Sequence, residues 1–390
     1  MSRPTCPLRQ RPRREWAPTG FRSLVSLLEV RNRMTGRWLL PDGQDSDLVS
    51  SDRAAADRPL RVGACLSLSG RYARFGRQAA RGLAAWRTLD GAAELIVADD
   101  RSDAGTLESV LPGVAARSDV LLGPYSTVLT RAAGKLAAEA GWLLWNHGGS
   151  GDDVQRVSPG HIVSVLAPAS RYAEPFVRHL AAATTGATLW ITHGRGSFGK
   201  QVATGAEALA RRAGVGTMHG DHRAALPPAD LTGPWDLFCA GSFEEDVGLI
   251  RRARASARPP RLVCAVAAGV RDFAGAAGDA EGVFGVGQWF PGAAQAPDLG
   301  PAEADFLAGY SALAGVLPDY PAVQAAAAAV LAAHCARQAA GTARDLLWPA
   351  ALALNTRTLF GDFRIRPGDG AQIGHTTVCV RWTAGRPARV

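Results

Sequence analysis

Several features that mark particular classes of protein are missing from this sequence. Its six cysteines lie far apart, with no C-x-x-C pair and no paired spacing of cysteine and histidine, which argues against a zinc site and predicts buried, reduced thiols. It has no G-x-S-x-G nucleophile elbow, which argues against a serine hydrolase. It also has no apolar run long enough to cross a membrane, so we expect no transmembrane segment.

The first 58 residues differ from the rest of the chain. Residues 1–40 contain nine arginines and only two acids, so they account for almost all of the net charge of +8. Prolines and arginines occur there without an apolar period, which predicts a disordered basic tail and linker over 1–58. The remainder is nearly neutral, so we expect no nucleic-acid binding by the folded body.

Neither a secretory signal nor a lipoprotein acylation site is recognisable near the start of this sequence. A signal peptide needs about 7–15 apolar residues after a basic start. The segment S-L-V-S-L-L-E-V is too short and contains Glu29, and Cys6 follows R-P-T, which does not fit an acylation site. As the sequence stands we expect a cytoplasmic protein, and an extracytoplasmic one if the start codon is misassigned.

From residue 59 onward, short apolar runs alternate with helical segments. Runs of this kind predict parallel sheets that are buried on both faces. The first series of expected strands is 61–68, 94–100, 119–124, 142–146 and 161–166. The second series is 188–193, 215–219, 237–241, 261–266 and 283–286, and segments 358–365 and 376–382 are predicted to pair as a closing hairpin. Two such series predict an α/β protein with two lobes.

The segment from Leu60 to Gly76 is predicted to open the first lobe. It reads as an apolar strand, a Ser69-Gly70 turn and a helix, which together begin a βαβ unit. Open parallel sheets bind their ligands beyond the carboxyl ends of the strands. We therefore expect this turn at one edge of a ligand cleft.

Five stretches in order resemble the leucine/isoleucine/valine-binding proteins, which have the type 1 periplasmic-binding fold and serve as solute receptors of ABC importers. The stretches are V-G-A-C-L-S-L-S-G-R-Y-A-R-F-G at 62–76, L-L-G-P-Y-S-T at 121–127, W-N-H-G-G-S at 145–150, Q-W-F-P-G at 288–292 and D-Y-P-A-V-Q at 319–324. The resemblance spans about 59–390 and implies two parallel-rich sheets flanked by helices, with a hinge. It implies lobe 1 at 59–168 plus 291–356 and lobe 2 at 169–290 plus 357–390.

Two loops of the first lobe are predicted to hold the polar end of a ligand. Gly123 to Thr127 ends a strand and opens a helix, where backbone N–H groups and hydroxyls suit an anion. The resemblance implies that Thr127 holds a ligand carboxylate; alternatively, Ser126 and Thr127 only cap the helix. It also implies ligand contacts from the loop at 146–150, in which His147 is either a contact or an ordinary loop histidine.

The second lobe and the helix after 319 are expected to complete the site. The resemblance implies an aromatic contact from Phe198 and a contact near Ser242, although the pattern S-x-x-E at 242–245 also predicts a capping box. It places an aromatic ligand wall at Tyr320, which is equally well explained as core, and Gln324 shares that helix face. The full predicted ligand-binding set is Phe75, Ser126, Thr127, Asn146, His147, Gly148, Gly149, Ser150, Phe198, Ser242, Tyr320 and Gln324.

One position departs from the pattern of the resembled family. Amino-acid receptors of that family usually carry a carboxylate at the position that matches Ala268, where it pairs with the ligand ammonium. We therefore expect non-enzymatic binding of a small polar solute, such as an amide, a carboxylate or an amino-acid-like molecule, with no cofactor. The implied partner is an ABC permease; the alternative is a cytoplasmic ligand sensor of the same fold, acting on a regulator protein.

A third alternative is a nucleotide-dependent oxidoreductase. Gly194-x-Gly196-x-x-Gly199 follows an expected strand and precedes an expected helix, and Asp221 lies 22 residues beyond Gly199, near the distance expected of a ribose-binding acid. Against this alternative, the fingerprint lies in the middle of the chain and the strand before Asp221 is interrupted by glycine. No catalytic acid–base set accompanies it.

Overall fold

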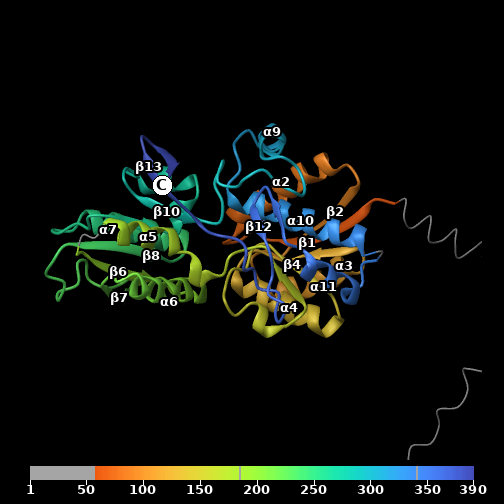
Figure 1. Ribbon diagram of the computed structural model, residues 1–390, viewed down its shortest axis with the longest axis horizontal. Helices are drawn as coiled ribbons and strands as arrows, with labels where there is room; N and C mark the ends of the chain where they lie inside the picture. Colours follow the sequence, from red (N-terminus) through yellow and green to blue (C-terminus); the bar gives the residue numbers. More distant parts are fainter. Residues whose placement is uncertain (1–57, 184–185, 340) are drawn as a thin grey trace, which may run out of the picture. The chain divides into compact units, whose positions relative to one another are not determined.

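The sheet of the first lobe consists of five parallel strands (Figure 1). The computed structural model describes residues 58–183, 186–339 and 341–390, so the predicted tail lies outside the described residues except for Arg58. The strands are β1 (Leu60–Leu66), β2 (Ala93–Asp99), β3 (Val120–Leu122), β4 (Leu144–Asn146) and β5 (Ile162–Ser164). Their order is β2-β1-β3-β4-β5, and the three short ones are buried throughout, as expected of strands covered on both faces.

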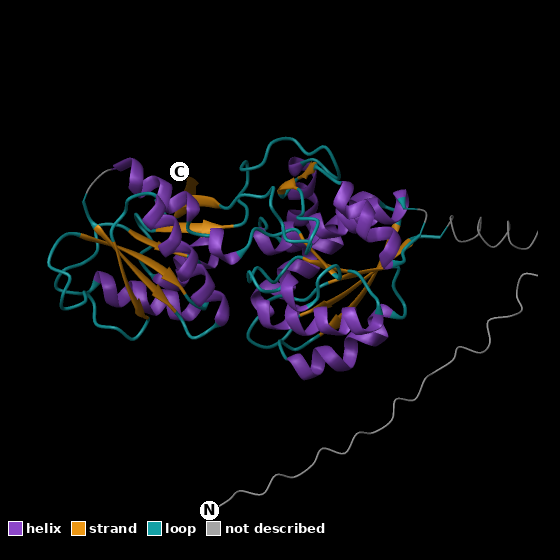
Figure 2. Ribbon diagram, turned by 60° about the horizontal axis from the view of Figure 1, so that its bottom comes forward, coloured by secondary structure: helices purple, strands orange, loops and turns teal. Residues whose placement is uncertain are grey.

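The helices of the first lobe lie on both faces of this sheet (Figure 2). They are α2 (Ala73–Asp90), α3 (Ala104–Ala115), α4 (Thr127–Ala140), α9 (Glu303–Ala314), α10 (Tyr320–Gln338) and α11 (Arg344–Ala353), with the short 3-10 helix η1 (Gln155–Val157). Helix α10 is rich in alanine and almost entirely buried, because it packs between α2 and strands β1, β3 and β4. Gly82 of α2 permits this packing, since a Cβ there would collide with the carbonyl of Ala322.

The sheet of the second lobe is larger and mixed. Its strands are β6 (Thr188–His193), β7 (Thr217–Asp221), β8 (Trp235–Ala240), β9 (Val263–Ala265), β10 (Phe284–Gly287), β13 (Val378–Thr383) and β14 (Arg386–Arg389). The order is β14-β13-β10-β9-β8-β6-β7; β6 to β10 run parallel, and β13 and β14 are antiparallel to their neighbours. Its helices are α5 (Glu174–Ala183), α6 (Ser197–Arg212), α7 (Phe243–Arg254) and α8 (Asp272–Ala277), with the 3-10 helices η2 (Ala169–Arg171) and η3 (Ala267–Gly269).

The predicted α/β fold with two lobes is confirmed, but the predicted closing hairpin is wrong. Strands β11 (Thr356–Thr358) and β12 (Gly361–Phe363) pair with each other, whereas β13 pairs with β10 and β14. The reason lies in the turn at Ala384-Gly385: both residues have positive φ, which closes a tight hairpin between β13 and β14.

The segment after β12 returns to the first lobe. The side-chain amide of Gln372 donates to the carbonyl of Val165, and the Ser164 amide donates to the carbonyl of Gly370. Residues up to about 372 therefore pack beside β5. The predicted second-lobe range of 357–390 begins too early by these contacts.

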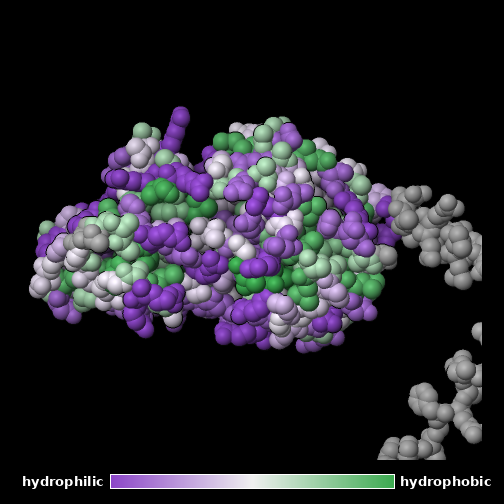
Figure 3. All heavy atoms as spheres, viewed as in Figure 1, coloured by the Kyte–Doolittle hydropathy of each residue, from purple (hydrophilic) through white to green (hydrophobic). Residues whose placement is uncertain are grey.

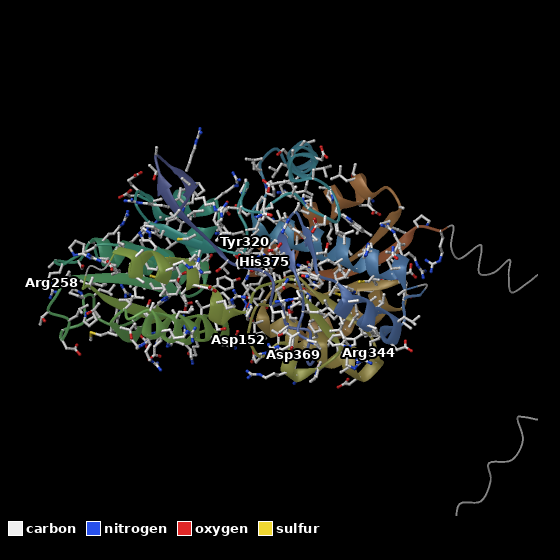
Figure 4. All side chains as sticks on the ribbon, in the orientation of Figure 1. Asp152, Arg258, Tyr320, Arg344, Asp369 and His375 are labelled. Atoms are coloured by element: carbon white, nitrogen blue, oxygen red, sulfur yellow. The ribbon has the colours of Figure 1, made fainter. Side chains whose placement is uncertain are left out.

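Buried hydrogen bonds join the three segments that connect the lobes. The Gln288 side chain exchanges two bonds with the backbone of Ala167, each 3.0 Å long, and the Gln288 carbonyl lies 2.8 Å from Nε2 of His375. The His375 ring (labelled in Figure 4) stacks on Phe360 with 4.2 Å between centroids, and burial lowers its pKa to about 4. The predicted Q-W-F-P-G motif thus lies at the hinge, where Gln288 rather than Trp289 carries the polar contacts.

Hydrophilic and hydrophobic residues are interspersed over the face seen in Figure 3. Of the helices in the described ranges, none combines the length and apolar character needed to span a bilayer. The five described cysteines are buried free thiols, which confirms the prediction for those positions.

Candidate functional site

The loop after β1 is held by two carboxylates at the end of β2. Asp99 accepts hydrogen bonds from the amides of Leu68 and Ser69, and the hydroxyl of Ser67 donates to Asp100 at 2.7 Å. This bracing fixes the start of α2, where Phe75 lies. Phe75 stacks on Tyr125, with 4.7 Å between ring centroids and 11° between ring planes. The structure therefore brings together the first two predicted stretches, and Tyr125 was missed in the sequence.

Both hydroxyl residues at the start of α4 already accept backbone hydrogen bonds. Ser126 has a φ of 93° and its Oγ accepts from the amide of Leu129, while the buried Oγ1 of Thr127 accepts from the amide of Gly151 at 3.1 Å. The capping alternative is thus present for Ser126, whereas Thr127 holds the loop at Gly151 and does not cap the helix. These bonds do not exhaust either side chain, because a hydroxyl that accepts one bond still has its own proton to donate.

Asn146 positions the loop at 146–150. Its Nδ2 donates to the carbonyl of Gly149 at 2.7 Å and to Oγ of Ser164 at 2.6 Å, and its Oδ1 accepts from the amides of Gly148 and Gly149. These four bonds use both of its donors and both acceptor sites of its oxygen. Asn146 therefore shapes the loop, and a direct ligand contact from it stays a prediction.

The two glycines of this loop allow close packing against the start of α4. A Cβ at Gly148 would collide with the Pro124 carbonyl, and a Cβ at Gly149 would collide with the side chain of Thr130. The hydroxyl of Ser150 accepts from Tyr172 at 3.4 Å. The resemblance implied that this loop contacts a ligand. In the structure, the two glycines closely approach the protein's own backbone and side chains instead.

Two buried polar side chains of the predicted set have atoms without a partner. His147 is fully buried, and neither of its ring nitrogens has a hydrogen-bond partner within the described part of the chain. Burial lowers its pKa to about 4, so the ring is neutral at physiological pH. Gln324, in the second turn of α10, has an unpartnered Oε1. Such atoms are uncommon in folded proteins and call for an explanation.

Tyrosines connect the predicted aromatic residues. The hydroxyl of Tyr320 (labelled in Figure 4) lies 3.4 Å from that of Tyr125, which also stacks on Phe75. On the second-lobe side, Phe198 meets Tyr172 edge to face with 5.3 Å between centroids. Burial raises the pKa of all three tyrosines, so they stay protonated and able to donate.

The lobes also meet through polar contacts near η1. Gln201 of α6 accepts from the amide of Asp152 at 2.6 Å and donates to Asp153 at 3.0 Å. Asp152 (labelled in Figure 4) in turn accepts from the hydroxyl of Ser170 at 2.9 Å. These bonds place the start of α6, and with it Phe198, beside the first-lobe loop.

Ser242 forms the predicted capping box with Glu245. Oγ of Ser242 accepts from the Glu245 amide at 3.3 Å, and the Glu245 carboxylate accepts from the Ser242 amide at 3.0 Å. The cap accounts for this serine without a ligand. The neighbouring Phe243 has a different contact, because the guanidinium of Arg74 lies 3.8 Å above its ring.

Arg74 is the main charged residue that sequence reasoning missed. It comes from the start of α2 in the first lobe and lies 3.5 Å from Asp272 and 3.8 Å from Glu244 of the second lobe. Its Nη1 is buried and has no acceptor in the described ranges. The sequence offered one hint, because Arg74 directly precedes the predicted contact Phe75. Nothing in the neighbouring residues indicated that its side chain contacts the other lobe.

Ala268 lies in η3, fully buried, at the edge of the second sheet. Its carbonyl accepts from Nε1 of Trp382 at 2.9 Å. The buried Asp246 lies behind this turn and accepts from the amide of Ala267 at 3.1 Å. Burial raises the pKa of Asp246 to about 7. The carboxyl group of Asp246 therefore holds the backbone of this turn. Position 268 itself carries no carboxylate, as the sequence indicates.

The glycine fingerprint does lie on a βαβ unit formed by β6, α6 and β7. A Cβ at Gly199 would collide with the carbonyl of Ala240, so this glycine allows close packing of helix and strand. A Cβ at Gly194 would collide with the Glu245 carboxylate, which also accepts from the amide of Arg195. An acidic side chain thus fills the space that the diphosphate of a dinucleotide would need.

The sequence profile of the periplasmic binding protein family matches residues 59–387. The chain belongs to this family. No curated protein gives a significant match. Within the described residues, no group of three or more histidine, cysteine, aspartate or glutamate side chains is arranged to hold a metal ion.

Solved structures of two kinds of solute-binding protein have the same fold. Leucine-binding protein LivK of Thermotoga maritima has a TM-score of 0.71 at 15% identity, covering 85% of this chain and 97% of its own. LivJ of Streptococcus pneumoniae, in complex with isoleucine, has a TM-score of 0.69 at 14% identity, covering 85% and 98%. A solute-binding protein of Rhodopseudomonas palustris HaA2, in complex with p-hydroxybenzoic acid, has a TM-score of 0.71 at 16% identity, covering 85% and 95%. The first prediction, a type 1 periplasmic-binding fold, is confirmed.

Proposed function

We propose that this protein is a non-enzymatic solute-binding component of an ABC transporter whose ligand carries a carboxylate or amide and no ammonium group. The ligand binds between the lobes, at the carboxyl ends of both sheets. The observation that carries this proposal is the charge arrangement there. The buried Nη1 of Arg74 has no acceptor within the part of the chain that the structure describes, and an alanine stands at position 268.

The acids near position 268 are already engaged, which argues against an ammonium ligand. Glu244 and Asp272 lie beside Arg74. Asp246 is fully buried and accepts from the Ala267 amide. An ammonium taken out of water without a partner costs several kcal/mol. A loss of about 2–5 kcal/mol corresponds to roughly 30- to 3,000-fold weaker binding.

The unpartnered groups favour an anionic or amide ligand instead. The free N–H of Arg74 and the hydroxyl protons of Ser126 and Thr127 are donors, which suit carboxylate or carbonyl oxygens. The stacked rings of Phe75 and Tyr125 provide a flat apolar wall. Proteins of this fold take both amino acids and hydroxybenzoates, so the fold accommodates ligands with and without an amine.

Native mass spectrometry of freshly purified protein, searching for carried-over ligand, is the first experiment. Calorimetry then compares leucine, isoleucine and valine with benzoate, 4-hydroxybenzoate, benzamide and short aliphatic carboxylates. We expect binding of at least one compound without an amine and none of the three amino acids. Micromolar binding of leucine to the unmodified protein would contradict the proposal.

A variant pair tests the role of position 268 directly. Ala268→Glu restores a carboxylate where amino-acid receptors have one, so it should improve leucine binding and weaken binding of an anionic ligand. Ala268→Gln is the matched control, since it has the same size without the charge. Equal effects of both variants would show that bulk, not charge, decides, and the charge argument would fail.

A further inference from the structure

A small cavity borders the hinge. Its volume is about 140 Å³, below the range of about 300–1,000 Å³ for pockets that take drug-sized ligands, so it suits a molecule of a few heavy atoms. Its walls come from two of the segments that connect the lobes, at 288–295 and 375–378, and from the hairpin of β11 and β12. None of the predicted ligand-binding residues lines it, and neither do Arg74 and Tyr125. The cavity is therefore separate from the interlobe site.

One nitrogen of a buried histidine faces this cavity. His375 is 3% exposed and forms part of the wall. Its Nε2 lies 2.8 Å from the carbonyl oxygen of Gln288, which can only accept, so Nε2 carries the ring proton. Nδ1 has no hydrogen-bond partner among the described residues, yet it is not one of the unpartnered atoms that are closed off from solvent. Since polar atoms of buried side chains nearly always have a partner, Nδ1 indicates where a ligand or solvent completes the bonding.

A glycine leaves the space in front of Nδ1 open. A Cβ at Gly361 would lie only 2.9 Å from Nδ1 of His375, and Gly361 has a φ of 131°, which residues with a side chain rarely adopt. Burial lowers the pKa of His375 to about 4, so the ring is neutral at physiological pH and Nδ1 keeps its lone pair. A ligand in this cavity must therefore offer a hydrogen-bond donor.

The two charged side chains of the cavity wall balance each other. Arg357 donates through Nε to Oδ1 of Asp362 at 2.7 Å. Within the described ranges, the two Nη atoms of Arg357 and Oδ2 of Asp362 have no hydrogen-bond partner. With His375 neutral, the wall carries no net charge, so an ion of either sign would lose hydration without a free counter-charge to replace it. A neutral molecule that both donates and accepts hydrogen bonds fits this lining better.

Aromatic rings supply the apolar part of the wall. Trp289 and Phe360 line the cavity, and the ring of Phe360 is held by its stacking on His375, with 4.2 Å between centroids. Rigid rings beside polar groups suit a molecule whose carbon chain is apolar and whose hydroxyls are not.

We propose that this cavity is a second ligand site, which takes a small neutral polyol. One hydroxyl donates to Nδ1 of His375, a neighbouring hydroxyl accepts from an Nη of Arg357, and the carbon chain lies against the rings of Trp289 and Phe360. The site does not depend on the nature of the interlobe ligand, because the two sets of residues do not overlap.

Calorimetry on the full chain compares glycerol and erythritol with glycerate and 1,2-dimethoxyethane. Glycerate keeps two hydroxyls but adds a negative charge, and 1,2-dimethoxyethane accepts hydrogen bonds but donates none. We expect at least one of the two polyols to bind at least tenfold more tightly than either comparison compound. If neither polyol binds, or if glycerate or 1,2-dimethoxyethane binds as tightly, the proposal is overturned.

Variants with matched controls locate the site. Ala294→Leu should abolish polyol binding by filling the cavity, whereas Ala296→Leu, in the same loop but outside the lining, should leave it unchanged. Arg357→Gln should weaken polyol binding at least tenfold, and Arg364→Gln, at an exposed position outside the lining, is its control.

A further variant separates this site from the interlobe site. Arg74→Ala should leave polyol binding unchanged, because Arg74 does not line the hinge cavity. Unchanged polyol affinity in a folded Ala294→Leu protein, or loss of it in Arg74→Ala, would place the polyol elsewhere and refute the assignment.

Discussion

The carboxyl edges of the two sheets are built differently. In the first lobe, polar side chains tie the loops together: Asn146 makes four hydrogen bonds within its own loop and to β5, and Asp99 holds the loop after β1. In the second lobe, the ring nitrogens of His222 and Oδ1 of Asp246 are buried without a hydrogen-bond partner among the described residues, and the capping box of Ser242 and Glu245 is exposed. The loops of the first edge are therefore tied together by buried side chains, whereas the helix start at the second edge is held by an exposed cap. Within the described residues both edges also keep buried atoms without a hydrogen-bond partner, such as those of His147 and His222.

This difference has energetic consequences. A polar truncation in the first lobe leaves several buried groups unsatisfied, so it should cost stability. A truncation in the second lobe should cost less stability. The following predictions test the comparison in order of expected effect.

Asn146→Ala should have the largest effect. It leaves the Gly149 carbonyl and the amides of Gly148 and Gly149 without their partner, at about 1–3 kcal/mol for each buried group that stays unsatisfied. We expect a loss of about 4 kcal/mol in the free energy of unfolding, measured by urea denaturation. A loss below about 1 kcal/mol would show that the loop is not held by this side chain.

The pH dependence of stability should come mainly from the first lobe and the hinge. Burial lowers the pKa of His147 and of His375 to about 4, below the ordinary value of about 6.5. Between these pH values the unfolded chain binds protons that the folded chain does not, so stability falls as the pH falls from about 6.5 to 4. For each residue the full loss is about 3 kcal/mol, at about 1.4 kcal/mol per pKa unit. Above pH 6.5 neither histidine makes the stability depend on pH, because it is neutral in both the folded and the unfolded chain.

The second lobe should add little to this slope. Burial lowers the pKa of His222 but raises that of Asp246, and a raised carboxyl pKa makes stability fall as the pH rises, which is the opposite sign. Thermal melts at pH 4.5, 5.5 and 7 compare two variants: the single variant His147→Asn and the double variant His222→Asn plus Asp246→Asn. The first variant should flatten the acid slope, and the double variant should change it less. The reverse order would refute this assignment.

Arg74→Ala should affect binding more than folding. Its guanidinium lies between an aromatic ring and two exposed acids, so its ion pairs add little stability. Loss of a charged donor to a carboxylate ligand should weaken binding roughly 10- to 100-fold, that is about 1.4–2.8 kcal/mol. Calorimetry uses whichever carboxylate binds the unmodified protein. Arg87→Ala, at an exposed position in the last turn of the same helix, should leave the affinity unchanged.

Ser242→Ala should have the smallest effect. Loss of an N-cap hydroxyl typically costs about 1 kcal/mol, and the position is exposed. Urea denaturation should show this modest loss, and ligand affinity should not change, because the capping box accounts for the side chain. A tenfold loss of affinity without a comparable loss of stability would instead support the predicted ligand contact at Ser242.

Local patterns in the sequence were sufficient for the elements and for several short-range motifs. The alternation of apolar runs and helices predicted the two sheets, since strands buried on both faces need continuous apolar residues. The spacing S-x-x-E predicted the capping box, and the helix expected after 319 is α10. The absence of a carboxylate at position 268 is also evident from the sequence alone. All of these depend on contacts between residues close in the chain or on one residue's own chemistry.

The functions of individual polar residues depended on contacts between distant segments. Arg74 meets residues about 170 to 200 positions away, Gln288 joins three segments, and β13 pairs with β10 rather than with the segment at 358–365. No local pattern encodes these distances. Whether a given hydroxyl, amide or guanidinium is free to bind a ligand is decided by which partners folding brings within hydrogen-bonding reach.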